Sequence, residues 1–399
     1  MRVDCPRVVV AGSTCLDILP EFGLPPGKPD TLVVPGSLVG VGPLRVSGGG
    51  VVPNTGLALH QLGVPTLLMG KVGDDLWGRL TVDTLRACDP ALVQGMVVAE
   101  GEPGSYTIVI DPPEADRAFL HFAGPNRDFG VHDIPYDQLD KVGLFHFGYP
   151  PVLPRMYSND GAEMADLFHR VKRRGPTTSL DVTLPDNESE AGKLDWRPWL
   201  LNVLPQVDLF LPNLLEVLFM LDHQRLAPVQ SVDGAEMADL GLLLRELTSR
   251  LLEMGAAIVM VKLGELGAYL RTTADPERLE GCGTCAPRDI QAWCNRELWV
   301  PCFQVEVART IGAGDCAVAG FLCAFVQGLS PEDTLMGAMA AGACNVERTD
   351  PGVPLPTWTN LWGRIQAGWP RVPVAMPSPG WQGPGEAGIW VGPDDACHS

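Results

Sequence analysis

The sequence predicts an α/β protein in which helices cover both faces of a mostly parallel sheet and a small β-lid lies across the open edge. Three observations support this fold class. Short β-rich runs alternate with helical patterns through most of the chain, as in parallel sheets with helical crossovers. Two extended segments punctuated by glycine and proline break the alternation. The 399 residues are also enough to bury a sizeable core.

The expected strands and helices follow one another in a regular order. Strands are expected where β-branched and apolar residues form short runs, and helices where apolar residues recur with helical spacing. Pro331 suits the first turn of the last helix. The expected strands are 7–11, 66–70, 144–147, 178–182, 207–211 and 258–262, and the expected helices are 54–62, 76–88, 161–173, 213–221, 235–254, 312–327 and 331–346.

The lid is assigned to two segments, about 18–46 and 103–123. The first contains an extended stretch, and the second reads as a hairpin around DPPEAD. A lid that closes excludes water from a reacting group. Its apolar edge has two interpretations, a homodimer surface or a surface that closes over substrate.

Two further segments lack sustained periodicity. Residues 274–301 look like an inserted loop, and residues 369–399 look like a Gly/Pro-rich C-terminal tail. Within the tail, 376–399 is the part least expected to pack. The main domain is therefore expected to span 1–368.

Charge and hydropathy exclude several partner classes. The net charge of −19 disfavours nucleic acid and anionic membranes as partners. The apolar part of the N-terminus is interrupted too early for a signal peptide, and no segment approaches the ~18 apolar residues of a membrane helix. We therefore expect a cytoplasmic protein.

The eleven cysteines leave one alternative open. A CxxC pair, Cys282 and Cys285, is followed by Cys294 and Cys302 in a segment rich in Gly, Pro and Trp. These could be zinc ligands, but the later pair lacks the close spacing of a zinc ribbon. The alternative is a set of reduced loop cysteines.

The most informative motif is RTIGAGDCAVAG, which joins a small-residue turn to an apolar helix. The amides of Gly312, Ala313 and Gly314 could close on an anion at the helix N-terminus. Asp315 follows in the first turn, where its carboxylate could orient and deprotonate a substrate hydroxyl. Ordinary helix capping is the alternative.

Two more motifs could hold an acceptor. Gly49 and Gly50, in SGGGVVPN, allow close approach of the backbone, and Asn54 offers a donor and an acceptor at a helix start. Asp17, expected at the end of the first strand, could accept hydrogen bonds from paired hydroxyls. A glycine turn with an Asn cap and a turn-forming Asp are the ordinary alternatives.

Two motifs could serve a nucleotide and its metal ion. Asn213 caps a helix whose third residue is Glu216, which could be a plain cap or could organise Mg²⁺ through water. In VKLGELGAYL, Gly264 and Gly267 would admit a flat nucleotide near the backbone, although a plain hairpin explains them as well.

In their order and separation, these five sites resemble the PfkB (ribokinase-like) carbohydrate kinase family. The resemblance covers about residues 6 to 350 and is strongest in SGGGVVPNTGLALHQLGVPTLLMGKVGDDLWG and RTIGAGDCAVAGF. It implies a ribokinase-like three-layer α/β/α sandwich with a β-lid. Each motif is weak alone, and their joint occurrence carries the resemblance.

The resemblance implies a role for each position. Asp315 would be the catalytic base, beside an anion hole formed by the amides of Gly312, Ala313 and Gly314. Asp17, Gly49, Gly50 and Asn54 would contact substrate hydroxyls. Asn213 and Glu216 would serve Mg²⁺ and phosphate, and Gly264, Gly267 and Asn345 would lie near the nucleotide.

This chain departs from the family pattern at several positions. Arg309 replaces an acidic or small polar residue that helps bind a monovalent cation in some members, which argues against a potassium requirement. Ile311 replaces a frequent Thr or Ser. Val52 and Pro53 are larger than the residues usual in the glycine turn.

The sequence therefore predicts an ATP- and Mg²⁺-dependent kinase that phosphorylates a hydroxymethyl group of a small sugar. One alternative is a nucleoside kinase on the same fold, in which Phe119 or Phe122 would stack on a base or simply pack. Another is a ligand-binding protein that has lost turnover, against which the intact GAGD argues.

Overall fold

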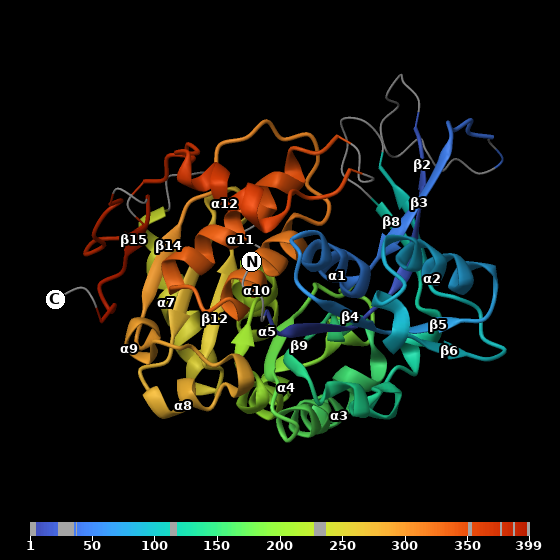
Figure 1. The fold of residues 1–399 in the computed structure, drawn as a ribbon, viewed down its shortest axis with the longest axis horizontal. Helices are drawn as coiled ribbons and strands as arrows, with labels where there is room; N and C mark the ends of the chain where they lie inside the picture. Colours follow the sequence, from blue (N-terminus) through green and yellow to red (C-terminus); the bar gives the residue numbers. More distant parts are fainter. Residues whose placement is uncertain are drawn as a thin grey trace.

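The computed structural model describes residues 5–22, 36, 38–111, 118–226, 237–349, 353–375, 377–385 and 388–396. Among these residues, a nine-stranded sheet has the order β15-β14-β13-β12-β11-β10-β9-β1-β4 (Figure 1). The strands, in chain order, are β1 Arg7–Gly12, β4 Thr66–Met69, β9 Val142–Gly148, β10 Thr177–Asp181, β11 Leu209–Phe210, β12 Ile258–Lys262, β13 Ala268–Thr272, β14 Glu297–Val300 and β15 Trp390–Val391.

The strands from β12 to β4 run parallel, and β13, β14 and β15 continue the sheet antiparallel. Most of the parallel strands are apolar on both sides because helices cover both faces, whereas β10 carries the buried polar residues Thr177, Thr178 and Ser179. In β1, Val8 and Val10 pack toward one helical layer, and Val9 and Ala11 toward the other. The predicted three-layer α/β/α architecture is therefore confirmed.

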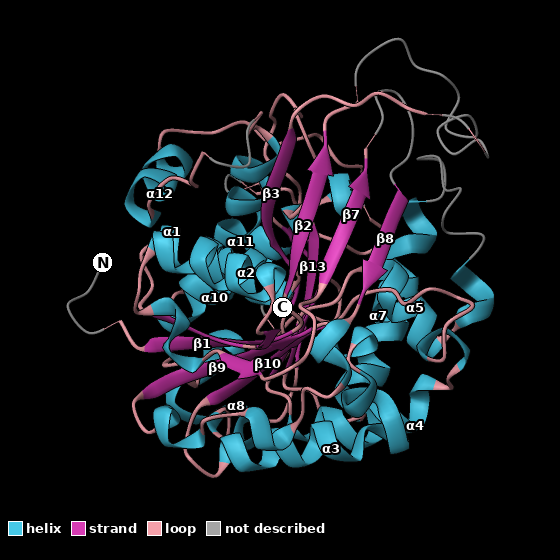
Figure 2. Ribbon diagram, turned by 90° about the vertical axis from the view of Figure 1, so that its right-hand side faces the viewer, coloured by secondary structure: helices cyan, strands magenta, loops and turns pink. Residues whose placement is uncertain are grey.

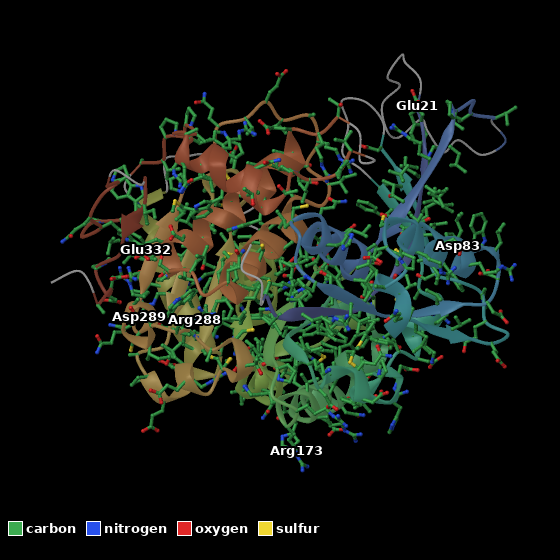
Figure 3. The ribbon with its side chains drawn as sticks, in the orientation of Figure 1. Glu21, Asp83, Arg173, Arg288, Asp289 and Glu332 are labelled. Carbon is green, nitrogen blue, oxygen red and sulfur yellow. The ribbon has the colours of Figure 1, made fainter. Side chains whose placement is uncertain are left out.

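Two groups of helices form the outer layers. One face carries α1 Val51–Gln61, α10 Ala313–Val326, α11 Pro331–Val346 and α12 Trp358–Gln366, together with the short α8 Pro276–Glu280 and α9 Ile290–Trp293. The opposite face carries α3 Pro154–Lys172, α4 Trp196–Val203, α5 Leu214–Leu221 and α7 Met237–Glu253. Charged side chains such as Asp83 and Arg173 point outward from the helices (Figure 3).

The lid is a separate four-stranded sheet that stands beside the main sheet (Figure 2). Its order is β3-β2-β7-β8, formed by β2 Cys15–Pro20, β3 Leu44–Gly49, β7 Tyr106–Ile110 and β8 Ala118–Phe122. Helix α2 Leu76–Cys88 packs against β2 and β3, and a two-stranded sheet of β5 Lys71–Gly73 and β6 Val97–Ala99 lies nearby. The predicted β-lid is present, although parts of its segments, 23–35, 37 and 112–117, lie outside the described residues.

The insertion and the tail differ from expectation. Residues 274–301 contain α8 and α9, and they end in β14, a strand of the main sheet. The tail strand β15 pairs with β14, and Trp381 lies about 6 Å from the rings of Tyr269 and Trp299. The described part of 376–399 is thus packed, contrary to prediction, because its tryptophans complete the core beside a sheet edge.

One helix prediction also needs correction, and two helices outside the insertion were not predicted. The helix expected over 161–173 begins at Pro154 and contains a break in which Asn159, Asp160 and Gly161 have positive φ, so regular helix resumes after Gly161. Helices α4 and α12 were not expected.

Within the described residues we find no helical stretch whose length and hydropathy would suit a bilayer-spanning segment.

Candidate active site

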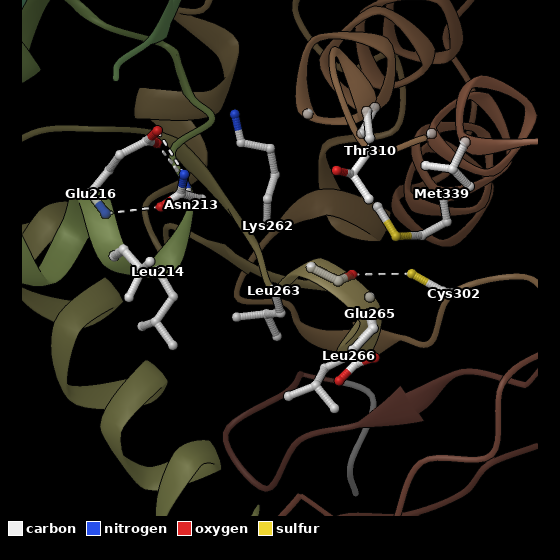
Figure 4. Close-up of a pocket in the computed structure, with 18 of the residues that line it drawn as sticks. Asn213, Leu214, Glu216, Lys262, Leu263, Glu265, Leu266, Cys302, Thr310 and Met339 are labelled. Atoms are coloured by element: carbon white, nitrogen blue, oxygen red, sulfur yellow. Dashed lines mark hydrogen bonds between the residues drawn. The ribbon is translucent and has the colours of Figure 1, made fainter. Parts of the chain in front are cut away.

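A cavity of about 1200 Å³ opens at the carboxyl ends of the parallel strands (Figure 4). Ligand sites of open α/β sheets occupy this position. Residues that follow β9, end β10, follow β11 and end β12 come together here, namely Tyr149, Asp181, Asn213 and Lys262. The first turn of α10 forms another wall.

The turn before α10 is built as the GAGD motif predicts. Gly312 adopts φ 74° at the N-cap, a conformation that favours glycine. The first helical bond runs from the Cys316 amide to the Gly312 carbonyl, so the Gly314 amide precedes the regular ladder. The Ala313 amide, expected in the anion hole, donates instead to the Thr310 carbonyl at 3.2 Å.

Asp315 is 5% exposed and accepts three hydrogen bonds. Its Oδ1 accepts from the Tyr149 hydroxyl at 2.6 Å and from Thr55 Oγ1 at 3.3 Å. Its Oδ2 accepts from Asn54 Nδ2 at 3.0 Å. A carboxylate offers about four acceptor positions, so one position remains on Oδ2 for a further hydroxyl. Asn54 therefore contacts the expected base.

Burial and hydrogen bonding act in opposite directions on Asp315. Burial raises the pKa of its carboxyl, and the bonds from Tyr149, Asn54 and Thr55 together with the charge of Lys262 lower it, with a net increase. The pKa of Tyr149 lies well above its usual value because the phenol is buried beside this carboxylate. Tyr149 therefore stays protonated and acts as a donor.

Lys262 is a largely buried cation, with a side chain 12% exposed, that the sequence patterns did not single out. Its Nζ donates to both oxygens of Asp181, at 2.8 and 2.9 Å. A Cβ at Gly314 would lie 3.8 Å from this ammonium, which places the charge over the start of α10. The charges of Asp181, Glu216 and Asp315 raise the pKa of Lys262 against the effect of its burial. Lys262 thus remains charged.

Asn213 and Glu216 form a capping box at the start of α5. The two oxygens of Glu216 accept from the backbone amide and side-chain amide of Asn213, at 2.6 and 2.7 Å (Figure 4). Burial raises the pKa of Glu216 to about 8 and that of Asp181 to about 6. Both residues line the cavity.

The carboxylate oxygens of Glu216 and Asp181 suit Mg²⁺ only if phosphate oxygens of a bound ligand complete its coordination. Glu216 and Asp181 offer hard carboxylate oxygens, which Mg²⁺ prefers. In the part of the chain that is described, no group of three or more His, Cys, Asp or Glu side chains is arranged to hold a metal ion. Mg²⁺ is commonly held by one or two carboxylates together with substrate phosphates. The site suits an ion that arrives with phosphate.

Asp17 lies on β2 of the lid and not at the end of β1, where it was expected. β1 ends at Gly12, and the chain enters the lid before reaching Asp17. A Cβ at Gly49 would fall 2.1 Å from Asp17 Oδ1, and Gly50, with φ 82°, starts α1 beside Ser13. Burial and the charge of Asp315 raise the pKa of Asp17 to about 6, against hydrogen bonds that lower it.

The three residues expected near a nucleotide divide into two groups. Gly264 and Gly267 form a turn between β12 and β13 that lines the cavity, with φ 60° and 100°. Asn345 is buried behind the GAGD turn, and its Nδ2 donates to the Ile311 carbonyl at 2.8 Å. Because Ile311 is held through its backbone, its side chain need not be polar. Asn345 thus positions the turn and is not among the residues that line the cavity.

Three of the four cysteines singled out in this region donate to different backbone carbonyls. Cys282 donates to the Arg278 carbonyl, Cys294 to the Ala274 carbonyl and Cys302 to the Gly264 carbonyl. Cys302 lines the cavity, where burial raises the pKa of its thiol to about 11.

Four residues were missed by sequence reasoning: Thr55, Tyr149, Asp181 and Lys262. A usable signal existed for one of them, because Lys262 is a charged residue that ends an otherwise apolar strand, whereas Asp181 ends the mostly polar strand TTSLD. Tyr149 follows β9 and adopts φ 63°, which only the folded chain reveals.

Comparisons with known proteins identify the family of the chain. The profile of the pfkB family carbohydrate kinases matches residues 27–358. The chain is 25% identical over 291 residues to an uncharacterized sugar kinase of Archaeoglobus fulgidus, covering 72% of this chain and 94% of that protein. It is 23% identical over 330 residues to the 2-dehydro-3-deoxygluconokinase of Bacillus subtilis, covering 80% and 86%.

A solved structure shares the fold. A putative ribokinase II from Escherichia coli, in complex with ATP and Mg²⁺, superposes with a TM-score of 0.65 and 20% identity, covering 91% of this chain and 99% of that one. The matched profile extends over most of the chain, from the lid to the start of α12. The chain therefore belongs to the pfkB family of carbohydrate kinases, phosphotransferases that act on an alcohol group.

Proposed function

We propose that this kinase transfers the γ-phosphoryl group of ATP to a hydroxymethyl group of a sugar, with Asp315 as the base. The observation that carries the proposal is the one acceptor position left on Asp315 Oδ2 beside the first turn of α10. A substrate hydroxyl bonded there would face a phosphoryl group held by the helix N-terminus. Alignment of the two groups supplies much of the rate enhancement.

The negative charge that develops on the transferring phosphoryl group would be stabilised by fixed positive groups. The Gly314 amide and the helix dipole favour an anion, and Lys262 lies next to them. The Ala313 amide would first have to leave the Thr310 carbonyl. We therefore assign the anion hole to Gly312 and Gly314 with Lys262, and Ala313 only after such a rearrangement.

ATP would occupy the large cavity, with its base along the apolar wall that includes Leu263, Leu266 and Met339 (Figure 4). Gly264 and Gly267 would lie against it. Asn213 and Glu216 would hold Mg²⁺ together with the phosphates, and bound Mg²⁺ would neutralise charge on the transferring group. With Arg309 in place of an acidic residue, we expect activity without added potassium.

Asp17 of the lid would align the acceptor from the side opposite Asp315. The charge of Asp315 raises the pKa of Asp17, so the two carboxyl groups interact across the site. Gly49 and Gly50 keep this approach open. A homodimer through the outer face of the lid, where Leu44, Val46 and Leu120 are 39–58% exposed, stays a prediction.

The test is an ADP-release assay with MgATP and a panel of sugars and nucleosides. The proposal expects sustained ADP release with at least one sugar that carries a hydroxymethyl group. A nucleoside that is strictly preferred would establish the alternative kinase function. Saturable binding of acceptor and ATP without turnover would establish a binding protein.

A further inference from the structure

One cross-strand row of polar side chains lies on the inner face of the lid. The register pairs Ser47 with Asp17, Asp17 with Thr107 and Thr107 with His121, across all four strands. Side chains at paired positions share one face of a sheet. The row is therefore Ser47–Asp17–Thr107–His121, and we call it the lid row.

Hydrogen bonds link three members of the lid row, Asp17, Thr107 and His121, with the help of Cys15. Thr107 Oγ1 lies 3.0 Å from His121 Nδ1, and Cys15 Sγ lies 3.4 Å from the same hydroxyl. Cys15 also donates to Asp17 Oδ1 at 3.6 Å. The opposite face of the lid is aromatic, with Tyr106 packed between Trp77 and Phe122. The two faces therefore differ in chemistry, and the polar face is the one that carries Asp17.

The charge of the lid row is negative or neutral. Asp17 is its carboxylate, and Ser47 and Thr107 are neutral. Partial desolvation of the ring lowers the pKa of His121, which is an exposed residue of β8, so that this imidazole is mostly uncharged at neutral pH. Apart from His121, Arg45 is the basic residue of the four described lid strands, and Lys28 and Arg117 belong to lid segments outside the described residues. It pairs with Leu19, one row farther along β2 from Asp17, and is exposed.

We propose that the lid row selects an uncharged acceptor with neighbouring hydroxyls and rejects sugar acids and sugar phosphates. An acceptor held between the lid row and Asp315 has a carboxylate at each end. A second anion there would meet like charge, whereas paired hydroxyls can donate to Asp17 and bond to Thr107 and His121. This inference rests on the proposed function and defines its substrate class.

The test compares neutral sugars of five and six carbons with the matching aldonic and 2-keto-3-deoxy acids. We expect kcat/KM to be at least tenfold higher for the best neutral sugar than for any acid. In Asp17→Asn, KM for the neutral sugar should rise at least tenfold, while the ratio of acid to neutral activity increases. Arg45→Gln is the matched control and should leave the neutral-sugar kcat/KM unchanged.

A binding measurement separates this inference from the proposed function. In the Asp315→Asn variant, thermal shift should show stabilisation by the neutral sugar and none by its acid. A sugar acid as the best acceptor, with its advantage lost in Arg45→Gln, would overturn the inference and leave the kinase function intact. Selective binding of neutral sugars without ADP release in the unmodified protein would overturn the function and support the inference.

Discussion

The hydrogen bond from Tyr149 to Asp315 gives a quantitative prediction. In Tyr149→Phe, Asp315 Oδ1 loses its shortest bond, at 2.6 Å, and keeps only Thr55. A hydrogen bond to a charged group contributes about 1.5–3 kcal/mol. One pKa unit corresponds to about 1.4 kcal/mol. The pKa of Asp315 should therefore rise by about one to two units.

The direction of the pKa change follows from the direction of the hydrogen bond. Tyr149 donates to the ionised carboxylate and lowers the pKa of Asp315, so its removal favours the protonated form, which cannot act as a base. The acid limb of the kcat/KM profile should move to higher pH by about one to two units. Activity near pH 6 should fall more than activity near pH 9.

The assay is coupled ADP release with saturating MgATP from about pH 5 to about pH 9. Tyr136→Phe is the matched control, because the Tyr136 hydroxyl is buried without a hydrogen-bond partner among the described residues and lies outside the cavity lining. An acid limb in Tyr149→Phe that coincides with that of the unmodified protein would refute the reasoning.

Three further predictions concern charge and packing. Lys262→Met combined with Asp181→Asn should fold and bind ATP but lose about 10²–10³ in kcat, and near-normal turnover would exclude Lys262 from phosphoryl transfer. Asp17→Asn should stabilise the ligand-free protein by about 1–2 kcal/mol near pH 8 and not below about pH 4. The reason is that the native carboxyl, with its pKa raised to about 6, loses stability as pH rises through that value; equal urea midpoints at pH 8 would contradict this. Deleting 377–399 removes two buried tryptophans, Trp381 and Trp390, and should lower the free energy of unfolding by about 5 kcal/mol or more, whereas an unchanged midpoint would mean that the tail contributes nothing.

The parts of the fold that depend on local signals could be predicted. The helices 76–88 and 331–346 match their expected bounds, since each combines apolar periodicity with a capping residue, Asp75 and Ser330. Strand β15 could not be predicted, because its two residues are held by pairing with β14 and by neighbouring tryptophans. Such stabilisation is tertiary and leaves no periodic pattern.

The site shows the same division. Gly312 and Asp315 are recognisable in one short motif, because the turn and the helix start are local. The hydrogen bonds that tune Asp315 come from residues 166 and 261 positions away in the chain, Tyr149 and Asn54. The ion pair of Lys262 with Asp181 is also made between separate strands. Strand pairing brings these groups together, and no single segment encodes it.

The most direct measurement is the turnover of Asp315→Asn, with nucleotide affinity measured alongside. Asn keeps the size of the side chain but cannot accept the proton, so kcat should fall by at least about 10²-fold while ATP affinity stays within about threefold. Asp83→Asn, at an exposed position on α2, is the matched control and should keep full activity. Turnover in Asp315→Asn close to that of the unmodified protein would contradict the assignment of Asp315 as the base.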